Sequence, residues 1–155
     1  MKARRHFAST PAVDIVLTNG QSLSGVHDQS VDLCYSYVVL QHLPSVEIIE
    51  DYCREVFRVL APGGLFRFQT QCVRDEGDDE IDRGGTLLGV RIFRTRLSRL
   101  LEKASLNVLE MTRNLSEEFE EVWVTARREP QPGERVPRRV LYRTPSSETA
   151  NVGRD

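Results

Sequence analysis

The side chains best suited to chemistry gather where two predicted strands end. Gln41 and His42 directly follow one apolar run, and Gln69 and Gln71 leave a second one. An imidazole can act as a general base or orient a substrate, and a carboxamide can donate and accept hydrogen bonds. A lone histidine beside apolar residues is more often structural, however, and the glutamines could instead satisfy loop backbone. Both interpretations stay open from the residues alone.

Composition limits the class of protein. With 155 residues, 39% of them hydrophobic, and a net charge of −2, the chain is predicted to form one soluble globular domain. The near-neutral charge gives no reason to expect nucleic acid or an anionic membrane as a partner. Cys34, Cys53 and Cys72 are odd in number and far apart, so neither a disulfide framework nor a Cys-x-x-Cys metal site is indicated. A reducing cytoplasm fits best, since no signal peptide or membrane span is visible either.

The elements that must position these side chains form a strand, a helix and a strand. Residues 31–40 are almost continuously apolar, which is typical of a strand buried on both faces of a parallel sheet. Residues 46–60 have apolar positions three or four apart, and Ser45 is a suitable N-cap. Residues 61–64, Ala-Pro-Gly-Gly, stop this helix, and a strand resumes at Leu65. Such a unit is the building block of a doubly wound sheet.

The stretch before this unit is predicted to contain a helix end, a strand and a loop. Residues 2–11 are interpreted as the end of a helix closed by proline, in preference to a frayed terminus. Residues 13–17 are rich in β-branched side chains and run into Thr18-Asn19-Gly20, which predicts a strand followed by a turn. Residues 21–30 are predicted to form a loop with a short turn of helix.

The stretch after the unit changes character. Residues 74–85 are acidic and glycine-bearing, which favours a mobile surface loop over a site for a divalent metal or a cationic substrate. Residues 97–104 have leucines at helical spacing, with Thr95 as a possible cap. Residues 106–111 and 122–126 are predicted strands.

Three further predictions concern residues around these strands. Arg58 and Arg67 are expected to be surface partners of nearby carboxylates, and Trp123 is expected in the core. Prolines, arginines and serines dominate residues 129–155. We therefore predict a folded domain over residues 1–128 and a disordered tail over residues 129–155.

The central unit resembles class I S-adenosylmethionine-dependent methyltransferases. The resemblance rests on residues 31–36, 39–44 and 54–64, and its most specific part is Arg58-Val-Leu-Ala-Pro-Gly-Gly64. It spans roughly residues 10–128. It implies an α/β fold with a Rossmann-like, doubly wound, mostly parallel sheet whose last strand is antiparallel. It also implies S-adenosylmethionine as methyl donor and, in our interpretation, a small-molecule acceptor.

The resemblance suggests cofactor contacts at two turns. Asn19 would bond the exocyclic amine of adenine while Gly20 lets the backbone approach, although Asn-Gly is also simply a good turn. Ser36 and Tyr37 occupy the position from which the family contacts the methionine moiety, unless the strand continues to Leu40. An open parallel sheet binds nucleotide-containing ligands outside the carboxyl ends of its strands, which is consistent with both turns.

The resemblance also implies that four residues face the methyl acceptor: Gln41, His42, Gln69 and Gln71. Methyl transfer from a sulfonium is an in-line displacement with an activated leaving group, so the protein chiefly aligns donor and acceptor. No particular catalytic residue is therefore predicted, and no metal.

The family's strongest signal is missing. The family has a Gly-x-Gly-x-Gly turn after its first strand and an acidic residue ending its second, and neither occurs before Val13. In the family's strand order, 3-2-1-4-5-7-6, the two absent strands are central. Residues 13–17 correspond to the family's third strand. They would then be separated from the strand at residues 31–40 by the positions of the two absent strands, or would pair with that strand directly. We therefore predict that this chain alone binds S-adenosylmethionine weakly or not at all.

Two explanations of the gap differ in function. In one, the chain belongs to an enzyme whose start lies further upstream. In the other, it is a non-catalytic remnant that pairs its exposed strand edge with another chain. A third interpretation, an unrelated α/β module similar to response regulators, would need an acidic cluster and a lysine at strand ends, and that set is not found in the sequence.

Overall fold

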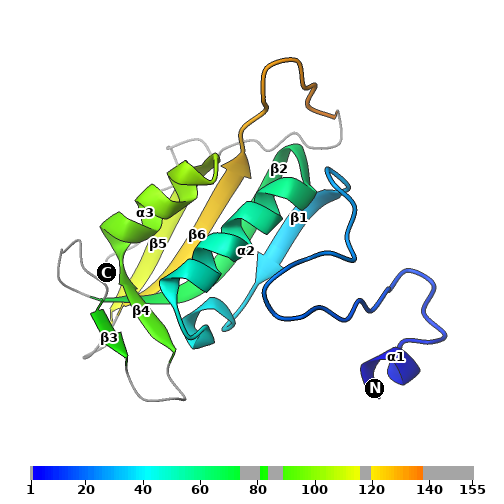
Figure 1. The fold of residues 1–155 in the computed structure, drawn as a ribbon, viewed down its shortest axis with the longest axis horizontal. Coiled ribbons are helices and arrows are strands. Elements are labelled where there is room, and N and C mark those ends of the chain that lie inside the picture. The colour runs from blue at the N-terminus through cyan, green and yellow to red at the C-terminus, as the bar shows by residue number, and fades with distance from the viewer. Residues whose placement is uncertain (1, 74–80, 84–88, 116–119, 138–155) are drawn as a thin grey trace, which may run out of the picture.

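A mixed β-sheet with two long helices packed on it forms the centre of the structure (Figure 1). The structure is a computed structural model and describes residues 2–73, 81–83, 89–115 and 120–137. In chain order the elements are α1 (Lys2–His6), β1 (Val31–Ser36), the 3-10 helix η1 (Leu40–His42), α2 (Val46–Val59), β2 (Leu60–Val73), β3 (Ile81–Arg83), β4 (Val90–Phe93), α3 (Arg94–Lys103), β5 (Leu106–Leu115) and β6 (Glu120–Arg128).

The sheet has the topology that the central unit predicted. Its strand order is β3-β4-β2-β6-β5, with β1 also paired to β2. β1 and β4 run parallel to β2, whereas β6 runs antiparallel to both β2 and β5. Thus β1, β2, β4 and β5 point the same way and the last long strand points the other way. The prediction of a Rossmann-like, mostly parallel sheet with an antiparallel last strand is confirmed.

Helix α2 forms where its apolar stripe and cap predicted it. Ser45 Oγ accepts the N–H of Ile48 at 3.4 Å, and the helix ends at Val59, one residue before the predicted end. Helix α3 is also confirmed, but the predicted cap is wrong. The capping position is Phe93, which makes no side-chain cap hydrogen bond, and Thr95 lies inside the first turn.

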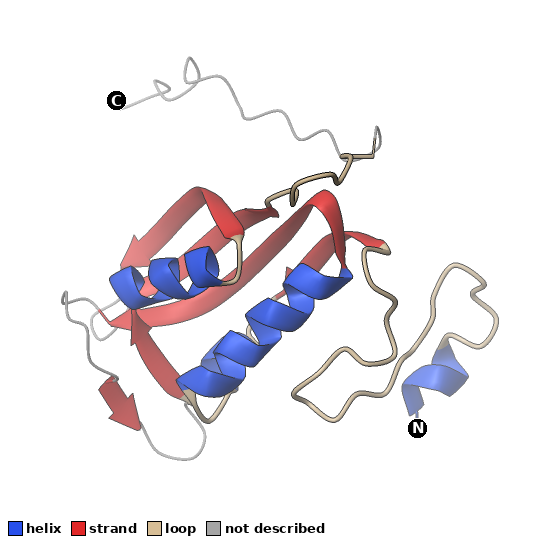
Figure 2. Ribbon diagram, turned by 45° about the horizontal axis from the view of Figure 1, so that its top comes forward, coloured by secondary structure: helices blue, strands red, loops and turns tan. Residues whose placement is uncertain are grey.

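The core lies between the sheet and these two helices. Figures 1 and 2 show α2 and α3 on the same face of the sheet. Since side chains alternate across a strand, every second residue of β2 and β6 faces the helices and the others face away. The buried apolar residues of this core include Ile49, Cys53, Val56, Phe66, Phe68, Leu97, Leu101, Leu106, Val122, Val124 and Ala126.

The segment before β1 differs from the prediction. Helix α1 confirms a helix near the start, although it ends at His6. Residues 13–17 form no strand, and Leu17 is 70% exposed, so the predicted strand is wrong. A β-branched run becomes a strand only with a ladder partner, and no described strand lies beside this one. Residues 21–30 form the predicted loop, with turns in place of the predicted short turn of helix.

Two predictions about the central strands also need correction. β1 ends at Ser36 rather than Leu40, and it is not buried on both faces, because Leu33 is 55% exposed and Tyr35 is 61% exposed. β1 pairs with β2 alone among the described strands, so one of its edges has no strand beside it. β2 begins at Leu60, so the strand starts directly where the helix stops.

The acidic segment directly after β2 lies mostly outside the described part of the chain. Of the acidic segment 74–85, the structure describes only Ile81–Arg83, which pairs antiparallel with β4 as a short strand that the sequence analysis did not predict. The predicted mobile loop therefore stays a prediction. β4 was likewise not predicted, and it extends the sheet beside the carboxyl end of β2 through Cys72 and Val73.

The two arginines expected to pair with carboxylates do so. Arg58 donates to Glu55 Oε1 at 2.8 Å and to the carbonyl oxygens of Leu23 and Val26 at 3.0 Å each, and thereby ties the loop before β1 to α2. Hydrogen bonds to Glu55 and Asp28 raise the pKa of Arg58 above its ordinary value. Arg67 lies 3.3 Å from Glu110 Oε2.

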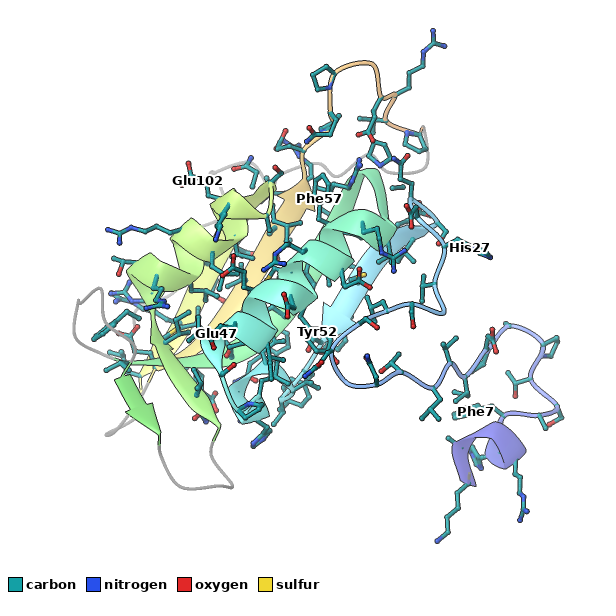
Figure 3. The ribbon with its side chains drawn as sticks, viewed as in Figure 1. Phe7, His27, Glu47, Tyr52, Phe57 and Glu102 are labelled. Carbon is teal, nitrogen blue, oxygen red and sulfur yellow. The ribbon has the colours of Figure 1, made fainter. Side chains whose placement is uncertain are left out.

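The chain after β6 makes a turn over residues 129–137 that brings Glu134 back to the end of the strand. The Arg128 side chain is 3% exposed and donates to both carboxylate oxygens of Glu134, at 2.7 and 2.8 Å. Its guanidinium also lies 4.4 Å from the ring centroid of Phe57. Figure 3 shows Phe57 near the carboxyl end of α2. Residues 138–155 lie outside the described part, so the domain boundary at 128 and the disordered tail stay predictions.

The Glu134 carboxylate predicts a specific acid sensitivity. Hydrogen bonds from Arg128 lower its pKa from 4.5 to about 2. A carboxyl group whose pKa is lower in the folded state than in the unfolded state stabilises the folded state at pH values above its unfolded-state pKa. This stabilisation is lost as the pH falls toward the folded-state pKa. Thermal unfolding of the wild type and Glu134→Gln should therefore differ above pH 4.5 and converge as pH falls to about 2. A constant difference between the two curves would contradict the assignment.

Candidate functional site

Most of the predicted site residues lie at the edge of the sheet where β1 and β2 have their carboxyl ends. Ser36 ends β1 opposite Phe68 in the register, and β2 continues past it through Gln69 and Gln71. The helix η1 follows β1 within four residues. This is the edge at which open parallel sheets bind ligands.

Tyr37 leaves β1 and stacks on an aromatic residue of β6. Its ring centroid lies 5.6 Å from that of Trp123, with an angle of 14° between the ring planes, and Tyr35 lies 6.2 Å from the same indole. The prediction that Trp123 is a core residue is wrong, since it is half-buried on the face away from the helices. Its buried neighbours Val122 and Val124 point to the core instead, and strand alternation is the signal that could have found this.

Gln69 of β2 contacts the turn that follows β1. It is 3% exposed, and its Oε1 accepts the backbone N–H of Val38 at 3.2 Å. Gln71, two residues further along β2, is half-buried and opposes Glu121 of β6. Of the two glutamines predicted to face the acceptor, the structure thus brings Gln69 into contact with the turn after β1.

Helix η1 carries the other pair of predicted residues. Gln41 is 7% exposed, and its Oε1 has no hydrogen-bond partner among the described residues. A buried carbonyl without a donor is costly, so this atom is a candidate ligand acceptor. His42 is exposed. Two residues before and in β4 contact this helix. The Val90 N–H donates to the Leu43 carbonyl at 2.9 Å, and Gly89 packs closely against the backbone of Gln41 and His42.

Asn19 and Gly20 lie elsewhere. Asn19 Oδ1 accepts the backbone N–H groups of Gln21 at 3.0 Å and Ser22 at 2.8 Å, so the side chain closes its own turn. Gly20 has a φ of +81°, and a Cβ there would meet nothing within 4 Å. Because the preceding residues form no strand, the structure does not bring this turn to a strand end.

A small apolar pocket lies between the exposed edge of β1 and α2. Its volume is about 320 Å³, and it is lined by Leu23, Cys34, Tyr35, Ser36, Tyr37, Val39, Leu40, Tyr52, Val56 and Phe66. Burial raises the pKa of the Cys34 thiol to about 11, and those of Cys53 and Cys72 to about 12. A thiol is nucleophilic as the thiolate, so none of the three is suited to nucleophilic catalysis at neutral pH.

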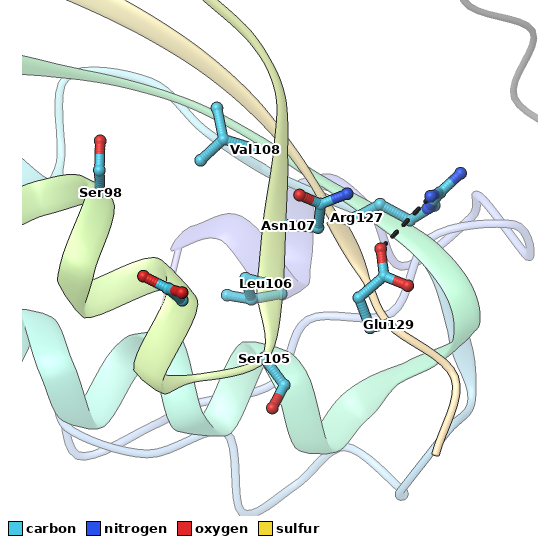
Figure 4. Close-up of a pocket in the computed structure, with 8 residues that line it drawn as sticks. Ser98, Ser105, Leu106, Asn107, Val108, Arg127 and Glu129 are labelled. Atoms are coloured by element: carbon cyan, nitrogen blue, oxygen red, sulfur yellow. Dashed lines mark hydrogen bonds and ion pairs between the residues drawn. The ribbon is translucent and has the colours of Figure 1, made fainter. Parts of the chain in front are cut away.

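A larger hollow, of about 590 Å³, lies between the end of α3 and the start of β5 (Figure 4). Its wall is mixed and includes Glu102, Asn107 and the ion pair of Arg127 with Glu129 at 3.3 Å. β5 runs in the same direction as β2, so its start lies at the opposite edge of the sheet from the carboxyl end of β2. We therefore place the candidate site at the carboxyl ends of β1 and β2, not at this hollow.

The candidate site is built to orient rather than to attack. It offers amide groups, a hydroxyl and aromatic rings, and the described residues contain no cluster of three or more His, Cys, Asp or Glu placed to hold a metal. None of the described helices is both long and apolar enough to cross a membrane. Alignment of two bound molecules is the chemistry such a site can support.

Known proteins share both sequence and fold features with this chain. The family described as "Methyltransferase domain" matches residues 1–68. The structure of the (4+2)-cyclase SpnF superposes with a TM-score of 0.66 at 17% identity, covering 83% of this chain and 61% of that one. A SAM-dependent methyltransferase from Methanosarcina mazei gives a TM-score of 0.62 at 17% identity, covering 84% of this chain and 77% of that one.

A third structure carries bound ligands. The 1,6-didemethyltoxoflavin-N1-methyltransferase from Burkholderia thailandensis, with 1,6-didemethyltoxoflavin and S-adenosylhomocysteine, gives a TM-score of 0.61 at 17% identity, covering 83% of this chain and 56% of that one. Among curated proteins none matches. The chain thus spans about three fifths of the SpnF structure and somewhat less of the Burkholderia enzyme. Residues 1–68 thus resemble the methyltransferase domain family in sequence, and the chain shares its fold with these solved structures.

Proposed function

We propose that this chain is part of a methyltransferase that transfers the methyl group of S-adenosylmethionine to a small-molecule acceptor. The observation that carries the proposal is the hydrogen bond from the Val38 N–H, in the turn after β1, to Gln69 Oε1 of β2, at the carboxyl ends of two neighbouring parallel strands. Two structural neighbours are methyltransferases named for small-molecule substrates, the Burkholderia enzyme and a geranyl diphosphate C-methyltransferase from Streptomyces coelicolor. The three free cysteines suit a reducing cytoplasm.

The residues of the candidate site fit the methionine end of S-adenosylmethionine but not its adenosine end. Ser36 and Tyr37 would hold the methionine moiety beside the apolar pocket, and the buried Gln41 Oε1 would accept a hydrogen bond from the donor or the acceptor. When bound, the donor supplies an electrophilic methyl group. The adenosine end fits poorly, because Asn19 is occupied by its own turn and no described carboxylate ends a strand beside β1. Weak binding by this chain alone follows from that mismatch.

A titration with the demethylated product tests the proposal. S-adenosylhomocysteine added to the ¹⁵N-labelled chain should bind with a Kd of about 1 mM or weaker, equivalent to about −4 kcal/mol or less. The amide shifts should be largest at residues 36–41 and 69. Tyr37→Leu should weaken them, whereas Asn107→Ala, in the hollow at the other edge, should leave them unchanged. Shifts centred on that hollow would refute the site, and micromolar affinity would refute the poor fit.

One observation favours a second function, an interaction module that pairs with another chain. β1 has β2 on one side and no other described strand, and its Leu33 and Tyr35 are exposed. An unpaired strand edge is a template for a further strand. If this function holds, sedimentation should show association that depends on concentration and is weakened by Leu33→Lys. A monomer at every concentration, with no partner bound, would argue against it.

A further inference from the structure

The turn after β1 holds a residue in an unfavourable backbone conformation. Val38 has a φ of +56°, in the left-handed region. For a β-branched residue this is an outlier, and such conformations cost on the order of 1–3 kcal/mol unless the surroundings hold them. Val38 is also exposed, so packing does not explain its conformation. Something at this turn has to compensate for the strain.

A hydrogen bond from the neighbouring strand provides that compensation. Gln69 Oε1 accepts the Val38 N–H at 3.2 Å, and Gln69 itself is 3% exposed. A buried side chain on β2 has few alternative positions, because β6 lies beside it with Trp123 directly opposite in the register. The amide oxygen therefore reaches the turn from a rigid support, shielded from water.

The same turn sets the position of Tyr37. The ring of Tyr37 is 58% exposed, yet it lies nearly parallel to the indole of Trp123 at 5.6 Å. Trp123 is held from another side by Arg67, whose guanidinium lies 5.2 Å from the indole and donates to Thr125 Oγ1 at 2.6 Å. The indole is thus a fixed surface, while the position of Tyr37 depends on the turn that follows it.

We infer that Gln69 is a positioning residue, whose side chain fixes the Tyr37–Val38 turn and thereby holds Tyr37 stacked on Trp123 at the rim of the site. The inference rests on the proposed function, because it is there that Tyr37 faces the methyl donor. Without the bond, Val38 relaxes to a negative φ and Tyr37 leaves the indole. Of the two roles predicted for Gln69, a contact with the acceptor or a bond to loop backbone, its bond to Val38 supports the second.

Gln69→Met tests the inference without any ligand. Methionine keeps the length and most of the volume of the side chain but removes the amide oxygen. Exchange of the Val38 amide hydrogen with solvent should accelerate about tenfold, the factor that corresponds to one hydrogen bond of about 1.4 kcal/mol. Trp123 is the single tryptophan of the chain, so its emission reports the stacking directly. The emission should shift in the same direction as in Tyr37→Leu, in which the stacked ring is absent.

Two matched variants separate positioning from folding. Gln71→Met, on the same strand and face, should leave Val38 exchange and Trp123 emission unchanged. Gln69→Glu keeps an oxygen acceptor at the same place and should restore slow exchange. If Gln69→Met fails to fold, as judged by circular dichroism, the wild type decides, because its Val38 amide must exchange more slowly than an unprotected amide.

Unchanged exchange and emission in folded Gln69→Met would overturn the inference. Fast exchange of Val38 in the wild type would overturn it as well. Failure of the proposed function looks different, since S-adenosylhomocysteine would then cause no shifts in a wild type whose Val38 is protected.

Discussion

Phe68→Ala is expected to lower the free energy of unfolding by about 3–5 kcal/mol, the range for removing a buried aromatic ring. Phe68 is fully buried, stacks on Phe66 at 4.5 Å, and opposes both Ser36 of β1 and Val124 of β6 in the register. Its ring therefore fills the space between the helices and the centre of the sheet. Because small domains are stable by only about 5–15 kcal/mol, this single change should leave the chain close to unfolded. Urea denaturation followed by circular dichroism measures it.

A second variant at the same position checks that volume is the cause. Phe68→Leu keeps most of the apolar volume and should cost clearly less than the alanine variant. Phe57→Ala is a positional control, since Phe57 is only half-buried and packs against Arg128 at the edge of the core. Equal losses for Phe57→Ala and Phe68→Ala would mean that the sheet centre is not the main source of stability.

Gly89→Ala is expected to displace η1 and to destabilise the fold. Gly89 has a φ of +62°, and a Cβ there would overlap the backbone oxygen of Gln41 and lie 2.6 Å from the Cα of His42. Alanine at positive φ costs on the order of 1 kcal/mol, and the overlap with rigid backbone adds to it. We expect a total of about 2–4 kcal/mol, measured by urea denaturation. Amide shifts at Gln41 and His42 should accompany the loss.

Gly20→Ala is the matched control for Gly89→Ala. Gly20 has a similar φ of +81°, but a Cβ there would meet nothing within 4 Å. It should therefore show only the backbone cost, and the difference between the two variants measures the contact between Gly89 and η1. Equal effects would show that η1 moves aside without cost.

Patterns among residues close in sequence correctly predicted several helices and strands. Helix α2 followed from its apolar stripe and the Ser45 cap, and β5 and β6 followed from runs of apolar residues. The antiparallel pairing of β6 came from the family resemblance, and the register confirms it. These features depend on residues that are close in sequence, or on a motif that is specific.

Features that depend on distant neighbours could not be predicted in this way. Residues 13–17 have strand-like composition, but strand formation needs a partner that composition does not reveal. Trp123 is apolar enough for a core; alternation with Val122 and Val124 indicates the opposite face, and the register opposite Gln69 shows which residues lie there. The polar residues at the strand ends were found because strand direction brings them to one edge, whereas the bond from Gln69 to Val38 depends on a backbone conformation unusual for valine.

The contact between Arg128 and Glu134 has a practical consequence for shortened versions of the chain. A fragment that stops at the end of β6 would lose the carboxylate that binds the Arg128 guanidinium, together with the residues that cover it. Arg128 would then keep its hydrogen bond to the Phe57 carbonyl and its contact with the Phe57 ring, but it would lose the ion pair that ties the following residues to the end of β6. Any expression fragment should therefore extend at least through Glu134, beyond the limit that amino-acid composition alone would suggest.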